Sequence, residues 1–266
     1  MTQTNGVDKQ RAVIVTGART GIGLEIALTF LRHGDTVVMT SRNIDIDSVE
    51  EGARDELQKF VNSKKAHFVT KDVSSSGACK ALVTEAVDAL GGSLDIVVNN
   101  AGNCKPGIPF EELSDEVWKD HFTLNLDSVF YMTQVVLPHL RKTKGCIVNV
   151  SSLGGIAPSN TMLPYCVAKA GVDMLTKATA LEYANEGIRI NSVNPGLVKT
   201  TFFDHSGMDK SNEDQMLADA AEQYPIGRVG VPSDVASAVY FLADNKAAAW
   251  ITGQQLALDG GKLLAQ

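Results

Sequence analysis

Short apolar runs rich in valine and isoleucine alternate along the chain with longer amphipathic stretches, and this alternation restricts the fold more than any other feature. Continuous apolar runs of this kind are typical of strands that are buried on both faces. The runs lie at 11–16, 36–40, 66–70, 95–99, 146–150, 188–193 and 255–258. Helical patterns between them lie at 22–33, 78–90, 117–140, 165–184 and 235–243.

The repeated strand-helix order predicts a parallel sheet, because parallel neighbours need a crossover connection and a helix usually makes it. We therefore expect an α/β protein with a doubly wound, Rossmann-type sheet of seven parallel strands and helices on both faces. No Pro/Gly-rich linker divides the 266 residues, so a single domain is predicted over 11–266. The polar stretch 1–10 is predicted to be a disordered tail.

Charge and composition exclude several classes of protein. The formal net charge is -7 with acids and bases interspersed, which disfavours nucleic acid and anionic membranes as partners. The four cysteines include no C-x-x-C pair and the five histidines show no metal-ligand spacing, so no metal site is expected. No apolar run approaches the roughly 18 residues of a membrane span, and we expect a cytoplasmic protein.

The sequence GARTGIG, residues 17–23, stands between the first strand and the first helix. Glycines at this place let the chain turn sharply and let a pyrophosphate approach the N–H groups at the start of the helix. An ordinary glycine-rich turn is the alternative. The position of the motif favours a dinucleotide site, because ligands of doubly wound sheets bind beyond the carboxyl ends of the strands.

The end of the second strand decides which dinucleotide is expected. An NAD enzyme usually offers a carboxylate there to the ribose 2′-OH, whereas residues 38–43 contain no acid and Arg42 follows Ser41. A 2′-phosphate would meet a cation at this place, which favours NADP(H). Arg19 could add a second cation, although both arginines could also be solvated loop residues.

Tyr165 and Lys169 are four residues apart in a predicted helix, so both side chains can face the same crevice. An ammonium about 5 Å from the phenol, at an effective dielectric of about 20, favours the phenolate by roughly 3 kcal/mol. We therefore expect Lys169 to lower the pKa of Tyr165, although desolvation opposes this shift. Ser152 lies just beyond the carboxyl end of the fifth strand, where it could hold a carbonyl oxygen or simply cap a turn.

Taken together, the motifs resemble the short-chain dehydrogenase/reductase family over nearly the whole chain. The resemblance rests on these ordered matches: TGARTGIG (16–23), DV (72–73), NNAG (99–102), LN (124–125), the serine at 152, YCVAK (165–169), NPG (194–196) and LDGG (258–261). One departure concerns the cofactor. NADP-using members often carry a basic residue directly before the second glycine, where this chain has Thr20, so the prediction of NADP depends on Arg42.

The resemblance implies a role for each matching residue. Tyr165 would be the general acid/base, Lys169 would lower its pKa and bind the nicotinamide ribose, Ser152 would hold the carbonyl, and Asn125 would hold a water. The implied cofactor-binding residues are Gly17, Arg19, Thr20, Gly21, Ile22, Gly23, Ser41, Arg42, Asp72, Val73, Asn99, Ala101, Gly102, Tyr165, Lys169, Pro195, Gly196, Val198 and Thr200.

We therefore expect an NADPH-dependent oxidoreductase that reduces a ketone or aldehyde, or oxidises a secondary alcohol, by direct hydride transfer. The expected partner is a small molecule. One alternative is a 3-oxoacyl-(acyl-carrier-protein) reductase, which YPIGRVGVPSDVASAVYFLA (224–243) resembles and for which Arg141, Lys142, Lys144 and Lys177 could form a basic patch. A second alternative is a non-catalytic sensor or scaffold that binds NADP.

Two further expectations concern the surface of the protein. The substrate pocket should be closed by 103–112, 153–163 and 200–224, with apolar members Leu153, Ile156, Met162, Leu163, Phe202, Phe203 and Met208. The helix predicted at 117–140 carries more than one apolar stripe, which indicates a second buried face. The resemblance implies a homotetramer in which this helix and the one at 165–184 make the subunit contact.

Overall fold

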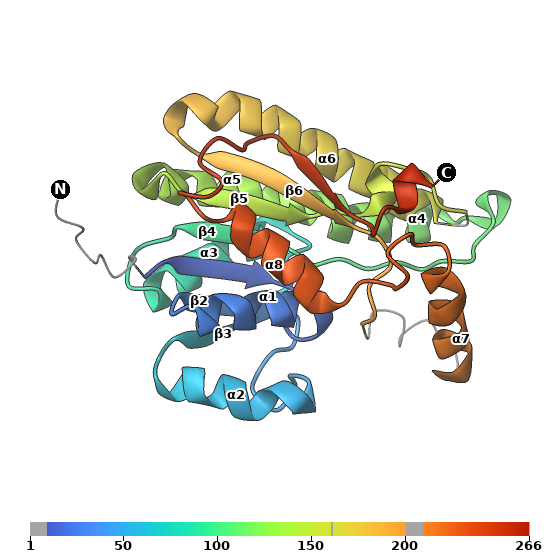
Figure 1. The fold of residues 1–266 in the computed structure, drawn as a ribbon. Helices are drawn as coiled ribbons and strands as arrows, with labels where there is room; N and C mark the ends of the chain where they lie inside the picture. Colours follow the sequence, from blue (N-terminus) through green and yellow to red (C-terminus); the bar gives the residue numbers. More distant parts are fainter. Residues whose placement is uncertain (1–9, 161, 201–209, 266) are drawn as a thin grey trace, which may run out of the picture.

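The computed structural model describes residues 10–160, 162–200 and 210–265. Within these residues, seven parallel strands form one sheet in the order β3-β2-β1-β4-β5-β6-β7 (Figure 1). This order confirms the predicted doubly wound sheet and the single-domain fold. The strands are β1 (Ala12–Thr16), β2 (Thr36–Ser41), β3 (Ala66–Thr70), β4 (Ile96–Asn99), β5 (Cys146–Val150), β6 (Arg189–Pro195) and β7 (Gln255–Leu258).

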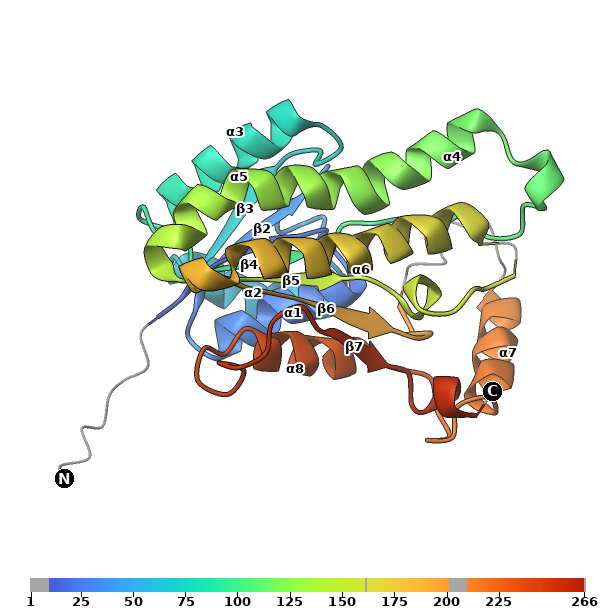
Figure 2. The same cartoon turned by 90° about the horizontal axis from the view of Figure 1, so that it is seen from above.

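Helices cover both faces of the sheet, as the view from above makes plain (Figure 2). Helices α1 (Gly21–Arg32), α2 (Glu51–Asn62) and α8 (Pro232–Leu242) pack on one face. Helices α3 (Ser76–Ala89), α5 (Ser128–Thr143) and α6 (Leu163–Tyr183) pack on the other. The shorter α4 (Asp115–Phe122) leads into α5, and α7 (Lys210–Ala221) lies beyond the carboxyl ends of the strands.

The apolar runs are buried on both faces because successive side chains of a strand point to opposite sides. In β1, Val13 and Val15 pack with Phe30 of α1, whereas Ile14 packs with Leu82 of α3 and Leu140 of α5. All of these side chains are almost fully buried. The two faces of one short strand therefore join the two halves of the core.

The helix predicted as one element at 117–140 is interrupted. A π-helical turn at Thr123–Asp127 separates α4 from α5, and the apolar pattern could not reveal it because both helices continue in nearly the same direction. The helices named from the sequence also did not include α2, which is polar on average and has Leu57 as its one buried residue, although Ala53, Leu57, Phe60 and Val61 recur at helical spacing. Of the tail predicted at 1–10, Gln10 is the described residue, and its side-chain amide donates to the Thr36 hydroxyl.

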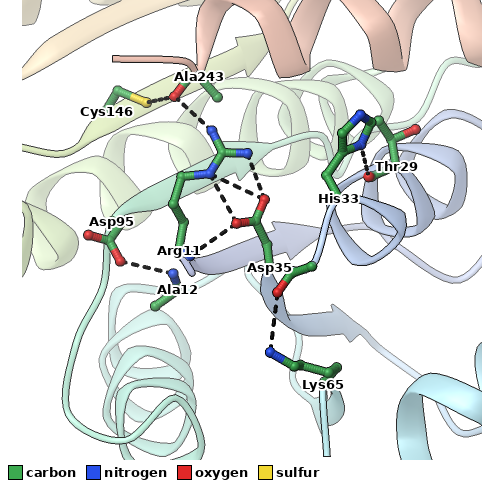
Figure 3. Close-up of polar contacts among 10 residues, drawn as sticks. Arg11, Ala12, Thr29, His33, Asp35, Lys65, Asp95, Cys146 and Ala243 are labelled. Atoms are coloured by element: carbon green, nitrogen blue, oxygen red, sulfur yellow. Dashed lines mark hydrogen bonds and ion pairs between the residues drawn. The ribbon is translucent and has the colours of Figure 1, made fainter. Parts of the chain in front are cut away.

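A largely buried ion pair lies at the amino ends of the strands, on the side of the sheet away from the glycine loop (Figure 3). Arg11, just before β1, donates from Nη2 to Oδ2 of Asp35 at 2.6 Å and from Nε to Oδ1 at 3.0 Å. The guanidinium also lies 4.7 Å from the centre of the Tyr240 ring, and Nη1 donates to the Ala243 carbonyl at 3.4 Å. One side chain therefore connects the start of β1, the α1–β2 turn and the end of α8.

Removing the carboxylate of this pair should destabilise the fold, because it leaves a largely buried guanidinium without its partner. We expect Asp35→Ala to lower the free energy of unfolding by about 3 kcal/mol, at the low end for buried pairs because Arg11 keeps some contact with water. Urea denaturation at neutral pH measures this change. Glu56→Ala removes an exposed partner of Arg32 and should cost about 1 kcal/mol or less; equal effects of the two changes would contradict the assignment.

Candidate functional site

The carboxyl ends of β1, β4, β5 and β6 border a cavity of about 410 Å³. This edge is where the strand order reverses, and the crevice at such a point is where doubly wound sheets bind their ligands. The predicted site residues that line the cavity are Gly17, Thr20, Gly21, Ile22, Gly23, Ala101, Gly102, Asn125, Ser152, Tyr165, Lys169, Pro195, Gly196, Val198 and Thr200.

A smaller cavity of about 100 Å³ adjoins the ends of β2 and β3. Ser41, Arg42, Asp72 and Val73 line it, together with Lys71, which the sequence analysis did not include. Arg42 is exposed, and the described residues contain no ion pair to it. Arg19 and Asn99, two other predicted cofactor residues, line neither of these two cavities.

Glycine is required twice in the loop after β1 for reasons of space. Gly17 has φ +64°, and a Cβ there would lie 2.9 Å from the Cα of Ala101. A Cβ on Gly23 would lie 2.3 Å from the Gly17 carbonyl oxygen. The Asn100 amide donates to the carbonyls of Thr16 and Gly17 at 2.9 and 3.1 Å, so the end of β4 clamps the loop in place.

Glu50 occupies the start of α1, a contact that the sequence analysis missed. Its Oε1 accepts a hydrogen bond from the backbone N–H of Gly21 at 2.7 Å, although it lies on the segment that leads into α2. A helix N-terminus attracts anions, and here a carboxylate of the chain itself already lies there. The fixed negative charge stands beside the glycine loop, where phosphate groups are expected.

Tyr165 and Lys169 extend from the first turns of α6 toward the ends of β4 and β5. The Lys169 Nζ lies 5.7 Å from the centre of the Tyr165 ring and donates to the Val150 carbonyl at 2.9 Å. The Ser152 hydroxyl lies close enough to the Tyr165 phenol to lower its pKa by hydrogen bonding. The predicted Ser152, Tyr165 and Lys169 are therefore brought together at one wall of the large cavity.

Burial dominates the protonation of this group. It raises the pKa of the Tyr165 phenol well above its ordinary value, and the hydrogen bond with Ser152 lowers that pKa by less. The expected net lowering of this pKa is therefore wrong, because desolvation is the largest influence on the phenol. Burial also lowers the pKa of Lys169 to about 8, while the Asp173 carboxylate acts in the opposite direction.

Asp173 is a second site residue that the sequence analysis missed. It follows Lys169 by one helical turn and is 5% exposed. Its carboxylate accepts hydrogen bonds from Ser192 Oγ at 3.2 Å and from Asn194 Nδ2 at 2.7 Å, and Asn194 also donates to the Ser152 carbonyl at 2.9 Å. A lone acid on the buried stripe of α6 was the signal in the sequence that could have revealed it.

Asn125 lies in the π-helical turn between α4 and α5 and is fully buried. Its Nδ2 donates to the His121 carbonyl at 2.9 Å and to the Asn103 carbonyl at 3.0 Å, and its Oδ1 accepts from the Asn103 N–H at 3.1 Å. A Cβ on Gly102 would lie 2.7 Å from that Oδ1 and 3.5 Å from the Lys169 Nζ. The π-helical turn therefore places Asn125 beside Lys169, as π-bulges often do at functional sites.

The predicted substrate lining is partly present. Leu153 and Met162 line the large cavity, joined by Ala157, Pro158 and Leu197, whereas Ile156 and Leu163 are exposed and do not line it. The predicted members Phe202, Phe203 and Met208 lie outside the described residues. No residue of the predicted closing segment 103–112 is among the described lining residues.

Two further features concern metals and membranes. Among the residues that the structure describes, no group of three or more His, Cys, Asp or Glu side chains could hold a metal ion. In the same part of the chain, no helix is long and apolar enough to cross a membrane.

Comparison with known proteins identifies the family. Residues 17–262 match the family described as Enoyl-(Acyl carrier protein) reductase. The 3beta-hydroxysteroid dehydrogenase 1 of Eggerthella lenta is 37% identical over 259 residues, which cover 96% of this chain and 95% of that protein. The chain belongs to the short-chain dehydrogenase/reductase family. It is therefore an oxidoreductase that acts on CH–OH groups with a nicotinamide cofactor.

Two more relatives agree with this assignment. A 3-oxoacyl-(acyl-carrier-protein) reductase of Chlamydia muridarum is 34% identical over 258 residues, which cover 97% of this chain and 99% of that protein. A short-chain dehydrogenase/reductase of unknown function from Caenorhabditis elegans, solved with cofactor, is 33% identical with a TM-score of 0.88 and covers 96% of each chain. The fold and the ordered motifs thus point to the same family.

The position of Glu50 leads to a prediction about how tightly this protein binds its nicotinamide cofactor. Glu50→Gln keeps the acceptor for the Gly21 N–H but removes a negative charge from the helix start. We expect it to tighten binding of the nicotinamide cofactor about two- to fivefold, measured by titration of protein fluorescence. Glu51→Gln, one residue further along, serves as the control, and weaker binding by Glu50→Gln would show that the charge is needed to hold the loop.

Proposed function

We propose that the chain is an NADPH-dependent reductase of ketones or aldehydes, able to oxidise the corresponding secondary alcohols, with Tyr165 as the general acid/base. The observation that carries this proposal is that Ser152, Tyr165 and Lys169 line one wall of the large cavity, with the Lys169 ammonium 5.7 Å from the centre of the Tyr165 ring. A proton donor, a carbonyl-holding hydroxyl and a cation are the groups that carbonyl reduction requires.

Each side chain has a distinct part in reduction. When bound, the reduced nicotinamide supplies a hydride to the carbonyl carbon. Ser152 donates a hydrogen bond to the carbonyl oxygen, and Tyr165 transfers its phenolic proton to that oxygen as negative charge develops on it. The raised pKa of Tyr165 keeps the phenol protonated at neutral pH, which suits a proton donor. Lys169 then stabilises the phenolate that remains.

Three features support the choice of NADP(H). The end of β2 carries no acid, Arg42 is exposed at the mouth of the smaller cavity, and Lys71 lines the same cavity. The cations could bind a 2′-phosphate by charge-assisted hydrogen bonds. Lys71 is also paired with Glu85 at 2.6 Å, so Arg42 is the cation more open to the ligand.

The relatives suggest several classes of substrate. A 3-oxoacyl-(acyl-carrier-protein) reductase is among them, which keeps the acyl carrier protein as a candidate partner. The basic patch expected for such a partner is weakened, because Arg141 is paired with Glu186. We therefore favour a small-molecule substrate over an acyl carrier protein.

Exposed apolar side chains on two helices support a subunit contact. A homotetramer would cover the exposed apolar side chains on α5 and α6, among them Phe130, Val167, Met174 and Leu181. The cytoplasmic location remains a prediction.

A sensor or scaffold without turnover is disfavoured by the intact set of Asn125, Ser152, Tyr165 and Lys169. A panel of ketones and secondary alcohols, tested with both cofactors, would separate these possibilities, since tight cofactor binding without any activity would favour the sensor.

Replacing the proposed proton donor gives the most direct test. We expect Tyr165→Phe to lower turnover by about a hundredfold or more while leaving cofactor affinity nearly intact, because it removes the hydroxyl but little volume. Single-turnover kinetics and cofactor titration measure the two quantities. Tyr183→Phe on the same helix is the matched control, and a loss below tenfold in the chemical step would refute the role of Tyr165.

The choice of cofactor is tested at the end of β2. Charge-assisted contacts from Arg42 to a 2′-phosphate, worth roughly 1.5 to 3 kcal/mol, should favour NADPH over NADH by about ten- to a hundredfold. The double change Ser41→Asp with Arg42→Ala should reverse this preference, because a carboxylate accepts from the 2′-OH and repels the phosphate. Values of kcat/KM with both cofactors decide the matter. Equal use of the two cofactors by the unmodified protein would show that Arg42 does not select.

A further inference from the structure

The charges that line the large cavity are unbalanced. Among its described lining residues, the charged side chains are Lys169 and Lys262, and no aspartate or glutamate is present. Lys169 lies under Tyr165 and donates to the Val150 carbonyl, so it already has a place in the site. Lys262 has no part in the proton transfer described above, and its ammonium is left to be explained.

Lys262 reaches the cavity from the end of the chain. It opens the short helical turn η6 (Lys262–Leu264), which follows β7 close to the marked C-terminus (Figure 1). Gly260 and Gly261 have φ +55° and +86°, which turn the chain sharply after the strand. The Asp259 carboxylate accepts from the N–H groups of Gly261 and Leu263 at 3.0 and 2.8 Å, so it holds this turn.

The partners of the Lys262 ammonium are neutral. Its Nζ donates to the side-chain oxygen of Gln223 at 3.2 Å and lies 5.1 Å from the centre of the Tyr224 ring. In the described part of the chain, no carboxylate forms an ion pair with it. Because neither the amide nor the aromatic ring carries a negative charge, this ammonium can still bind an anionic ligand.

Tyr224 gives this ammonium a defined position in the site. The ring is 4% exposed, and its hydroxyl accepts the Leu197 N–H at 2.7 Å. A Cβ on Gly196 would lie 2.7 Å from the same hydroxyl, so Tyr224 packs directly against the loop that follows β6. Lys262 is thereby tied to the loop that lines the cavity on its β6 side.

We propose that the substrate is an oxo or hydroxy acid whose carboxylate binds Lys262 while its carbonyl or hydroxyl carbon reacts at Tyr165. The apolar residues Leu153, Met162 and Leu197, which line the same cavity, would contact the body of the molecule. A carboxylate would meet a cation and no repelling acid among the described lining residues, whereas a neutral substrate would leave the ammonium with neutral partners alone. The inference rests on the proposed oxidoreductase function and adds the substrate class.

Matched pairs of substrates test this proposal. Linear methyl-ketone acids of increasing chain length are compared with their methyl esters, which differ in the negative charge. We expect the unmodified protein to favour the acid by about tenfold or more in kcat/KM for at least one chain length. Lys262→Met should reduce this acid-to-ester ratio about tenfold, mainly through KM of the acid, and Lys262→Arg should preserve it.

Two controls separate the possible results. Lys80→Met, on the exposed face of α3, should leave the ratio and the melting temperature as they are. Lys262→Met should change the affinity for NADPH less than twofold; an equal loss for cofactor and acid would overturn the proposal and assign Lys262 to the cofactor. Equal kcat/KM for every acid and its ester in the unmodified protein would also overturn it.

A failure of the proposed oxidoreductase function would look different. In that case no member of the panel is turned over with either cofactor, and binding of the same acids to the NADP-loaded protein is measured by calorimetry. Acids that bind the unmodified protein at least tenfold more tightly than Lys262→Met would support the anion site without turnover. Acids that bind both proteins alike, or neither, would overturn it.

Discussion

The backbone ladder of the parallel sheet is the constraint on which the rest of the structure depends. Parallel strands must all run in one direction, so each connection returns along a face of the sheet and every carboxyl end arrives at the same edge. Here that rule brings together the glycine loop after β1, Ala101 and Gly102 after β4, Ser152 after β5 and Val198 after β6. Residues as far apart in the sequence as 17 and 198 therefore line one cavity.

The helix that carries the proposed catalytic pair places three ionisable groups in a row. Tyr165, Lys169 and Asp173 follow one another at intervals of one turn on α6, which packs on β6 and reaches the end of β5 through Lys169. Burying charged groups is costly, and the cost is offset because each has partners: Val150 for Lys169, Ser192 and Asn194 for Asp173. Since Asn194 also holds the Ser152 carbonyl, the same network fixes the position of the serine relative to the tyrosine.

The nucleotide end of the site combines charges of opposite sign. The first N–H of α1 is bound by Glu50, whereas Arg42 and Lys71 border the smaller cavity beside it. In the complex with NADPH that we propose, cofactor affinity is a difference between attraction at the end of β2 and repulsion at the start of α1. The large cavity has no such balance among its described lining residues, because Lys169 and Lys262 line it and no aspartate or glutamate does.

The sequence by itself determined the seven strands, the glycine loop, the place of Ser152 after a strand and the pairing of Tyr165 with Lys169, while Asn125 was predicted from the resemblance to the family. The first four follow from local rules: apolar runs, glycines between a strand and a helix, a polar residue after a strand, and side chains one helical turn apart. The tertiary structure alone decided the π-helical turn at Thr123–Asp127, the contact of Glu50 with a residue 29 positions away, and the raised pKa of Tyr165. Those depend on which segments meet and how much water they exclude, and neither quantity is written in the spacing of residues along the chain.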